Sequence, residues 1–194
     1  MRDPQQVRAE ALHDDAQIEQ RFYEIDPEQR MDAVMRLLAS FRPESCVAFC
    51  FTKQQCQELV DHLIANGISA MALNGDLEQR DRDQVLAMFA NRSLSVLVAT
   101  DVAARGLDID ALDMVINVEL ARDPEIHVHR VGRTGRAGNQ GLAMSLVAPA
   151  EAHRAQAIEK LQQAPLNWQP LDGLKAKTGA PLQPPMATLC IGAG

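Results

Sequence analysis

Residues 94–109 read Leu-Ser-Val-Leu-Val-Ala-Thr-Asp-Val-Ala-Ala-Arg-Gly-Leu-Asp-Ile. The run 94–99 is largely apolar without regular alternation, which is typical of a strand buried on both faces of a parallel sheet. Thr100 or Asp101 can cap a short helix whose free N–H groups suit a phosphate. Gly106 then permits a tight reversal of the chain. A buried strand that runs directly into a capped helix predicts an α/β fold.

The segments on either side repeat the alternation of strand and helix. Further strands are predicted at 45–51, 68–73, 114–118 and 142–147, with an extra strand near 18–25. Helices are predicted over 28–40, from Thr52 to a stop at Gly67, around Val85–Phe89, and over 149–163. This order predicts an open parallel sheet with helices on both faces. Ligands of such sheets bind beyond the carboxyl ends of the strands, so the loops after the strands are the segments to examine.

Composition limits the classes of function. The chain has 194 residues and a net charge of -7, and a freely acting nucleic-acid binder is usually basic. No apolar run approaches the roughly 20 residues of a membrane span, and no secretory segment is recognised. The four cysteines, Cys46, Cys50, Cys56 and Cys190, form no Cys-x-x-Cys pair and indicate no metal site. We expect reduced core thiols in a cytoplasmic protein.

The strongest site signal is the segment 129–138, His-Arg-Val-Gly-Arg-Thr-Gly-Arg-Ala-Gly. Arg130, Arg133 and Arg136 recur at intervals of three, and no acidic residue lies between 126 and 150. On a short helix this spacing would keep the guanidinium groups in one sector, where they repel each other unless an anion lies among them. Arginine suits bidentate contact with phosphate and stabilises charge on a transferring phosphoryl group. The alternative for such a cluster is a solvated basic face.

Two further segments carry weaker signals. Asp108, beyond the turn at Gly106, can hold a ribose hydroxyl or orient the arginines, although a structural salt bridge is the alternative. Gln79 and Arg82 lie three residues apart after Gly75, hence on one helical face. A helix rich in Arg, Asp and Gln is as often a solvated surface.

Together these motifs resemble the C-terminal RecA-like domain of DEAD-box RNA helicases, over about residues 18–165. The segment 47–53 looks like motif IV, with Phe51 where the family often has Asn. Residues 75–82 look like the Gly-Asp-x-x-Gln-x-x-Arg motif, with Asn74 where the family often has His. Residues 100–108 match motif V, and residues 129–138 match motif VI. Four motifs in the right order make the resemblance specific.

The resemblance implies a role for each of these positions. Arg133 and Arg136 would be arginine fingers for ATP hydrolysis, with Asp108 and Gly106 in the ATP-binding segment. His129 and Arg130 would lie at the interface with a partner domain. The RNA backbone would be held by the residues from motifs IV to V, namely Thr52, Gly75, Gln79, Arg82, Thr100 and Arg105. Such contacts position RNA without specifying its sequence.

The resemblance also implies what other parts of the enzyme supply. The chain contains no Gly-x-x-x-x-Gly-Lys-[Ser/Thr] and no Asp-Glu-Ala-Asp. We therefore expect ATP and Mg²⁺ to be bound with the N-terminal RecA-like domain, which carries the Mg²⁺ ligands, and the chain alone to be inactive as an ATPase. The expected substrate is RNA, in particular ribosomal RNA in large-subunit assembly.

The same resemblance divides the chain into four parts. Residues 1–17 are expected to be an interdomain linker, 18–168 the RecA-like domain, 169–185 a second linker, and 186–194 the truncated start of a C-terminal RNA-binding domain. Two alternatives remain. One is a non-catalytic module that binds RNA or protein through a helicase-like fold, and the other is a domain from a DNA translocase of the same superfamily.

Overall fold

The computed structural model describes residues 18–107, 109, 111–135 and 140–171. The strands are β1 Ile18–Glu24, β2 Cys46–Phe49, β3 Ala70–Leu73, β4 Val96–Ala99, β5 Met114–Asn117, β6 Gly141–Val147 and β7 Trp168–Gln169. The α-helices are α2 Arg30–Phe41, α3 Lys53–Ala65, α4 Gln79–Ala90, α5 Asp101–Ala104, α6 Pro124–Val131 and α7 Ala152–Gln162. Two 3-10 turns, η1 Pro27–Gln29 and η2 Pro149–Glu151, precede α2 and α7.

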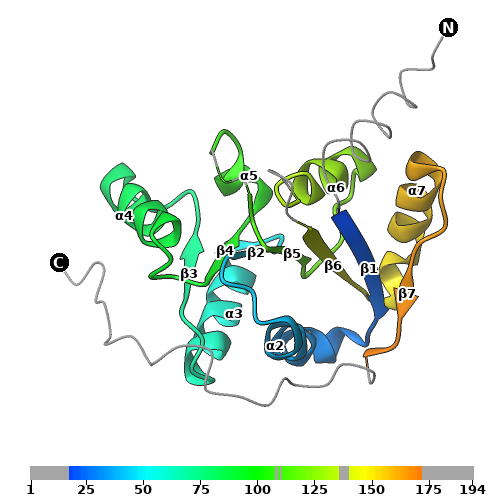
Figure 1. Ribbon diagram of the computed structural model, residues 1–194, viewed down its shortest axis with the longest axis horizontal. Coiled ribbons are helices and arrows are strands. Elements are labelled where there is room, and N and C mark those ends of the chain that lie inside the picture. The colour runs from blue at the N-terminus through cyan, green and yellow to red at the C-terminus, as the bar shows by residue number, and fades with distance from the viewer. Residues whose placement is uncertain (1–17, 108, 110, 136–139, 172–194) are drawn as a thin grey trace, which may run out of the picture.

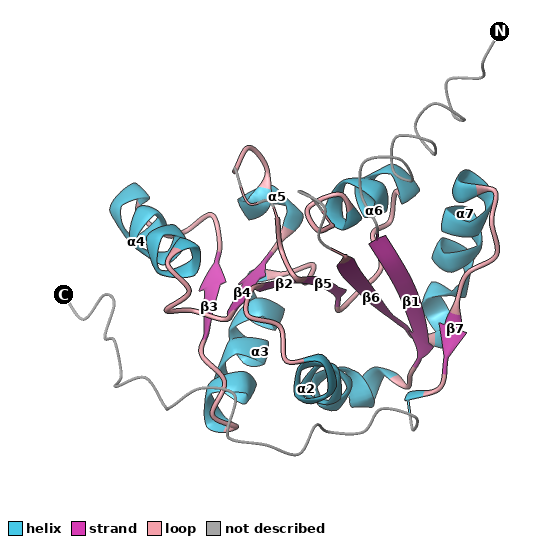
Figure 2. Cartoon of the chain, viewed as in Figure 1, coloured by secondary structure: helices cyan, strands magenta, loops and turns pink. Residues whose placement is uncertain are grey.

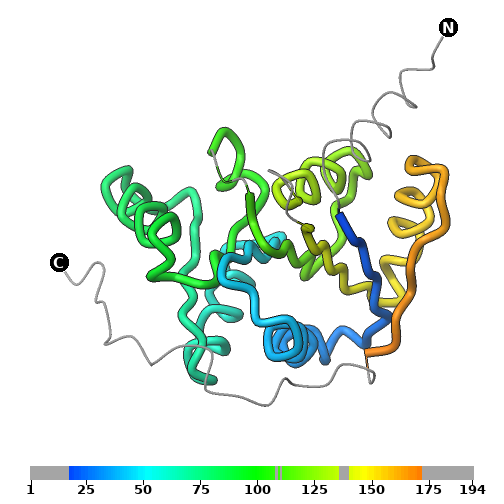
Figure 3. Tube along the Cα trace, in the orientation of Figure 1, coloured from blue at the N-terminus to red at the C-terminus, as the bar shows by residue number. Residues whose placement is uncertain are grey.

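The strands form one sheet in the order β3-β4-β2-β5-β6-β1-β7, and neighbouring strands run parallel. Helices α2 and α3 lie on one side of this sheet, while α4, α5 and α6 lie on the other (Figures 1 and 2). The α/β fold with an open parallel sheet is therefore confirmed. The path of the chain crosses the sheet repeatedly, as the trace in Figure 3 shows, so segments distant in sequence meet at its edge.

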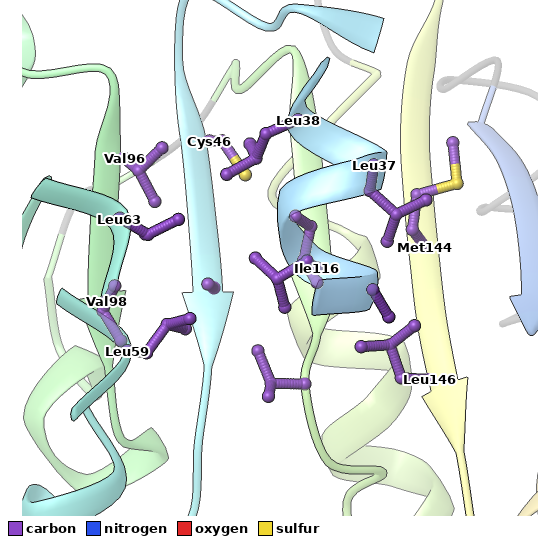
Figure 4. Close-up of a cluster of buried hydrophobic side chains, with 14 of the residues drawn as sticks. Leu37, Leu38, Cys46, Leu59, Leu63, Val96, Val98, Ile116, Met144 and Leu146 are labelled. Atoms are coloured by element: carbon purple, nitrogen blue, oxygen red, sulfur yellow. The ribbon is translucent and has the colours of Figure 1, made fainter. Parts of the chain in front are cut away.

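Alternate residues of the central strands pack into two separate cores. In β2, Cys46 and Ala48 face the core built with α2 and α3, while Val47 and Phe49 face the core built with α4 and α5. Figure 4 shows the first of these cores, in which Leu37, Leu59 and Leu63 meet side chains from the sheet. Burial on both faces explains why these strands are apolar throughout.

The predicted helix caps are confirmed. The Thr52 side chain accepts a hydrogen bond from the backbone N–H of Gln55 at 3.1 Å, and the Gln55 side chain accepts from the N–H of Thr52 at 3.1 Å. Thr100 accepts from the N–H of Ala103 at 3.2 Å. Gly106 has a φ of +78°, the left-handed conformation that its reversal requires. Each cap lies directly beyond a strand and fixes the loop that carries site residues.

Some expected boundaries differ. Strands β2 to β5 are shorter than predicted, because the flanking residues leave the sheet to form the loops at its edges. Residues 169–171, which the resemblance assigns to a linker, pack with the domain, because β7 pairs with β1 and Leu171 packs on the core. Cys46, Cys50 and Cys56 are buried free thiols, as expected, whereas Cys190 lies outside the described residues. Among the described helices, none has the length and apolarity that crossing a membrane needs.

Candidate functional site

The sheet brings together three of the predicted RNA-binding residues. Gly75, Thr100 and Thr52 follow the carboxyl ends of β3, β4 and β2, which are neighbours in the sheet. Adjacent strands are about 4.8 Å apart, so the three loops lie side by side within roughly 10 Å. This edge, made of Gly75, Thr100 and Thr52, is called the carboxyl edge below.

The chemistry of the carboxyl edge suits an anion. Each threonine hydroxyl accepts a backbone N–H as a helix cap, which leaves its own proton available to a phosphate oxygen. Thr52 is exposed, whereas Thr100 is only 8% exposed. Gly75 is exposed, and a Cβ at this position would meet nothing within 4 Å. The open space over Gly75 allows another backbone to approach closely.

The other predicted RNA-binding side chains lie around this edge. The Arg82 guanidinium donates to the carbonyl of Ala103 at 3.2 Å and so links α4 to α5. Gln79 is exposed and donates to Asp83 at 2.8 Å, within its own helix. Arg105 is exposed just after α5. Arg82 is therefore partly used inside the domain, while Arg105 projects from its surface.

A second feature is a cleft of about 390 Å³ between α5 and α6. Its lining includes the motif residues Arg105, Gly106, His129, Arg130 and Arg133. It also includes the carboxylates of Asp101, Asp123 and Glu125. Two of the predicted motifs, V and VI, thus meet in one concave surface although about 25 residues separate them in the sequence.

Arg133 is held in this cleft by main-chain carbonyls. Its Nη1 donates to the carbonyls of Leu107 and Ile109 at 3.1 and 3.3 Å, and its Nη2 donates to that of Ala104 at 3.3 Å. Within the described residues its guanidinium forms no ion pair. Hydrogen bonds from a guanidinium to a phosphate are stronger than those to neutral carbonyls, so an anion in the cleft can compete for this group.

Arg130 occupies a different environment from the one predicted for it. Its side chain is 2% exposed and binds both carboxylate oxygens of Asp101, at 2.7 and 2.6 Å. It also donates to Asn117 Oδ1 at 3.2 Å and to the Glu119 carbonyl at 2.8 Å, and it lies 4.9 Å from the centre of the Phe49 ring. We therefore assign Arg130 to the interior of this domain rather than to an interdomain contact.

The expectation that one short helix carries all three arginines is wrong. Helix α6 ends at Val131, and Gly132 begins a turn. Arg130 points to α5 and the end of β5, whereas Arg133 points to the loop after α5. Pairing with Asp101 and with carbonyls, rather than a shared anion, separates the two charges. Arg136 and Asp108 lie outside the described residues.

His129 is exposed at the rim of the cleft, where a partner domain can reach it.

The described acidic and histidine side chains around the cleft do not form a metal site. Among the described residues no group of three or more His, Cys, Asp or Glu could hold a metal ion. Two of the three acidic residues that line the cleft are engaged within the domain: Asp101 pairs with Arg130, and Asp123 caps α6 through the N–H of Glu125 at 2.9 Å.

Sequence reasoning missed the residues that hold Arg130. In the sequence Asp101 is recognisable only as a candidate helix cap, and neither Asn117 nor Phe49 is recognisable as a site residue. Asn117 is fully buried, donates to Ser145 at 2.9 Å and accepts from Arg130. The available signal was a polar residue ending an otherwise apolar strand, which a buried position permits only with a hydrogen-bond partner.

Comparison with known proteins agrees with this geometry. The family described as helicase conserved C-terminal domain matches residues 29–138, which include the carboxyl edge and most of the cleft. A solved structure of the DEAD-box protein SrmB from E. coli, bound to regulator of ribonuclease activity A, superimposes with a TM-score of 0.76 at 32% identity, over 84% of this chain and 97% of that one. The chain belongs to the DEAD-box helicase C-terminal domain family.

Other relatives of this DEAD-box domain point the same way. It is 53% identical over 193 residues to the ATP-dependent RNA helicase DbpA of Escherichia coli (strain K12), covering 100% of this chain and 42% of DbpA. It is 42% identical to the DEAD-box ATP-dependent RNA helicase CshA of Bacillus anthracis, over 82% of this chain and 30% of CshA. The domain therefore spans less than half the length of these curated relatives.

Proposed function

We propose that the chain acts as the C-terminal half of an ATP-dependent RNA helicase, to which it contributes arginine fingers and part of an RNA-backbone groove. The observation that carries the proposal is Arg133, which lines the cleft and, among the described residues, is held by the carbonyls of Ala104, Leu107 and Ile109 rather than by a carboxylate. A side chain placed in this way is poised to exchange carbonyl oxygens for phosphate oxygens.

In this proposal the cleft between α5 and α6 receives the phosphates of ATP. Arg133, together with Arg136, stabilises the charge that develops on the γ-phosphoryl group, a contribution worth about 10³–10⁵ in rate for one finger. Asp108 and Gly106 bind the ribose of ATP. Mg²⁺ supplies further neutralisation of the phosphates when it is bound, and its ligands come from the N-terminal RecA-like domain. The chain alone would then be inactive as an ATPase.

The carboxyl edge serves the other substrate. Thr52, Gly75 and Thr100 offer hydroxyl protons and open space to the RNA backbone, with Arg82, Gln79 and Arg105 in support. The bidentate Arg130–Asp101 pair joins the helix that Thr100 caps to the segment that carries Arg133. This connection would make RNA binding and finger position depend on one another.

The partner in catalysis would be the N-terminal RecA-like domain, which His129 contacts when the two domains close. The 53% identity to the ATP-dependent RNA helicase DbpA supports an RNA substrate. We propose that this RNA is ribosomal RNA in large-subunit assembly, in the cytoplasm. The alternative is a non-catalytic module that binds RNA or protein. It predicts that the chain has no effect on ATP turnover in any context, and the experiment below distinguishes it from the helicase proposal.

The test replaces the matching segment of E. coli DbpA with this chain and measures RNA-stimulated ATP hydrolysis. We expect the chimera to be active and Arg133→Ala to lower turnover by about 10³-fold or more, while binding of a fluorescent ATP analogue persists. Arg133→Lys is the matched variant, which keeps the charge but loses the fork of donors. Unchanged turnover in Arg133→Ala would contradict the finger assignment, and an inactive chimera that is folded would favour the non-catalytic module.

A further inference from the structure

An aromatic ring and two arginines extend the carboxyl edge beyond Thr52. The guanidinium carbons of Arg122 and Arg154 lie 5.3 and 5.1 Å from the centre of the Phe51 ring. Phe51 follows β2, Arg122 follows β5, and Arg154 lies in the first turn of α7, after β6. Because β2, β5 and β6 are consecutive in the sheet and parallel, all three side chains lie beyond the carboxyl ends of neighbouring strands.

The two arginines are used differently. Arg154 donates to the carbonyl of Leu120 at 3.2 Å and lies 3.6 Å from Glu151, which also pairs with Arg30 at 2.8 Å. Its side chain is 19% exposed, so it supports the ring from within the domain. Arg122 is exposed, and within the described ranges it forms no ion pair and no hydrogen bond. The ring contact is what orients Arg122.

The other charged side chains described around this position have partners of their own. Lys53, the other cation next to Thr52, is paired with Asp76 at 2.5 Å. The neighbouring carboxylate of Asp123 caps α6. Arg30 and Arg154 share Glu151. Within the described residues Arg122 therefore has no carboxylate partner, and its guanidinium lies against Phe51, the residue before Thr52.

A guanidinium stacked on a ring keeps its N–H groups at its periphery, where they can reach a ligand. The contact with Phe51 restricts the side chain before binding, so less conformational entropy is lost on forming a bidentate bond. Arg122 offers a planar fork of donors, and the Thr52 hydroxyl nearby has a proton available for a further hydrogen bond. The ligand that fits these donors is a phosphate of a polynucleotide. Continuity with Thr52, Thr100 and Gly75 favours RNA over an acidic protein.

We propose that the RNA-backbone groove continues from Thr52 to Arg122, and that Arg122 binds the phosphate next to the one held at Thr52. Phe51 is the positioning residue for Arg122. This inference rests on the proposed RNA-binding function of the carboxyl edge and adds one further phosphate contact, on the β5 side of the sheet.

The experiment measures binding of the intact chain to a fluorescein-labelled single-stranded oligouridine of about 10 nucleotides, by anisotropy over a range of salt concentrations. We expect Arg122→Ala to weaken binding about 3- to 10-fold at low salt and to reduce the slope of log affinity against log salt by about 0.7, the value for one lost contact to single-stranded nucleic acid. Phe51→Leu should weaken binding to a smaller extent, because the cation remains but is less ordered.

Lys160→Ala is the matched control, since Lys160 is an exposed cation near the end of α7, away from the carboxyl end of β6. Arg82→Ala reports on the proposed function itself. Weaker binding in Arg82→Ala with no change in Arg122→Ala overturns this inference and leaves the proposed function standing. No binding by the unmodified chain at low salt overturns both, and an equal loss in Lys160→Ala overturns the specific contact in favour of bulk charge. Weaker binding in both Arg82→Ala and Arg122→Ala, with binding of Lys160→Ala and the thermal unfolding midpoint of Arg122→Ala unchanged, supports the groove.

Discussion

At the scale of the residue, identical side chains three positions apart have opposite roles. Arg130 is buried and fully paired, while Arg133 is half-buried and held by neutral carbonyls. The sequence identifies the arginines but does not distinguish them, because their environment depends on where α6 ends and on Asp101, which comes from another loop. Thr52, Thr100 and Gly106, in contrast, are defined by local rules of capping and turns, and their geometry was predicted correctly.

The Arg130–Asp101 pair gives a prediction about stability. Removing one partner of a buried ion pair leaves an uncompensated charge, which costs about 3–5 kcal/mol. We expect Arg130→Ala to lower the free energy of unfolding in urea by at most this amount, because water reaches part of Asp101, which is 29% exposed. Arg105→Ala, at an exposed position, should change it by less than about 0.5 kcal/mol. Equal and small effects of the two substitutions would show that the pair does not stabilise the domain.

Two glycines provide a second prediction at this scale. A Cβ at Gly141 would lie 2.4 Å from the backbone nitrogen of Gly135, so Gly141→Ala forces the chain apart and should cost about 1–3 kcal/mol. Gly75→Ala meets nothing within 4 Å in the domain and should leave the unfolding free energy nearly unchanged. If the RNA backbone approaches Gly75 as proposed, this silent substitution should weaken RNA binding. Loss of stability without loss of binding in Gly75→Ala would contradict that role.

At the scale of the element, α6 is attached to the sheet by His127. Its ring is fully buried, stacks on Phe22 at 5.8 Å, and lies with Nε2 3.1 Å from Gln20 Oε1 in β1. The sequence predicted the existence and type of every central strand because each is a short apolar run, but it did not reveal contacts such as this one. Strand ends were misjudged where apolar residues continue into a loop, as at Cys50, and the two-residue strand β7 is too short to give a periodic signal.

His127 makes stability depend on pH. Burial, and then the charge of Arg130, lower the pKa of His127 to about 3. In the unfolded chain this pKa has its ordinary value near 6.5, so between pH 6.5 and pH 3 the unfolded chain binds one proton more than the folded one. The contribution of His127 to the free energy of unfolding is therefore fully present above pH 6.5 and is lost as the pH falls below that value. This group should remove about 2 kcal/mol from the unfolding free energy between pH 6.5 and 5.

The check compares urea unfolding of the chain and of His127→Gln at pH 7.5 and 5.0. We expect the difference between the two pH values to be smaller in His127→Gln, whatever its overall stability. His153→Gln, at an exposed position on α7, is the matched control and should keep the full pH dependence. An unchanged pH dependence in His127→Gln would mean that other groups dominate the acid response.

At the scale of the whole molecule, the net charge of -7 and the proposed RNA site are compatible because the charge is unevenly placed. The segment 126–150 contains three arginines and no acidic residue, while acids prevail elsewhere. Overall charge therefore excludes binding by bulk attraction but not a local cationic site.

We predict that the isolated chain does not hydrolyse ATP above background with or without oligouridine, measured by phosphate release. Robust RNA-stimulated turnover by the chain alone would contradict its assignment as half of an enzyme.

The position of β1 has a consequence for synthesis on the ribosome. This first strand lies between β6 and β7, with Ile18 opposite Gly141 and Phe22 opposite Trp168. As the chain emerges from its amino end, β2 to β5 can pair with one another, but β1 has no neighbour until nearly the whole domain has been translated. Long-range parallel pairing of this kind closes late and slowly. Strand β1, with its two core residues Phe22 and Tyr23, therefore stays unpaired in the nascent chain and is exposed to chaperones and to mispairing until the last strands are made.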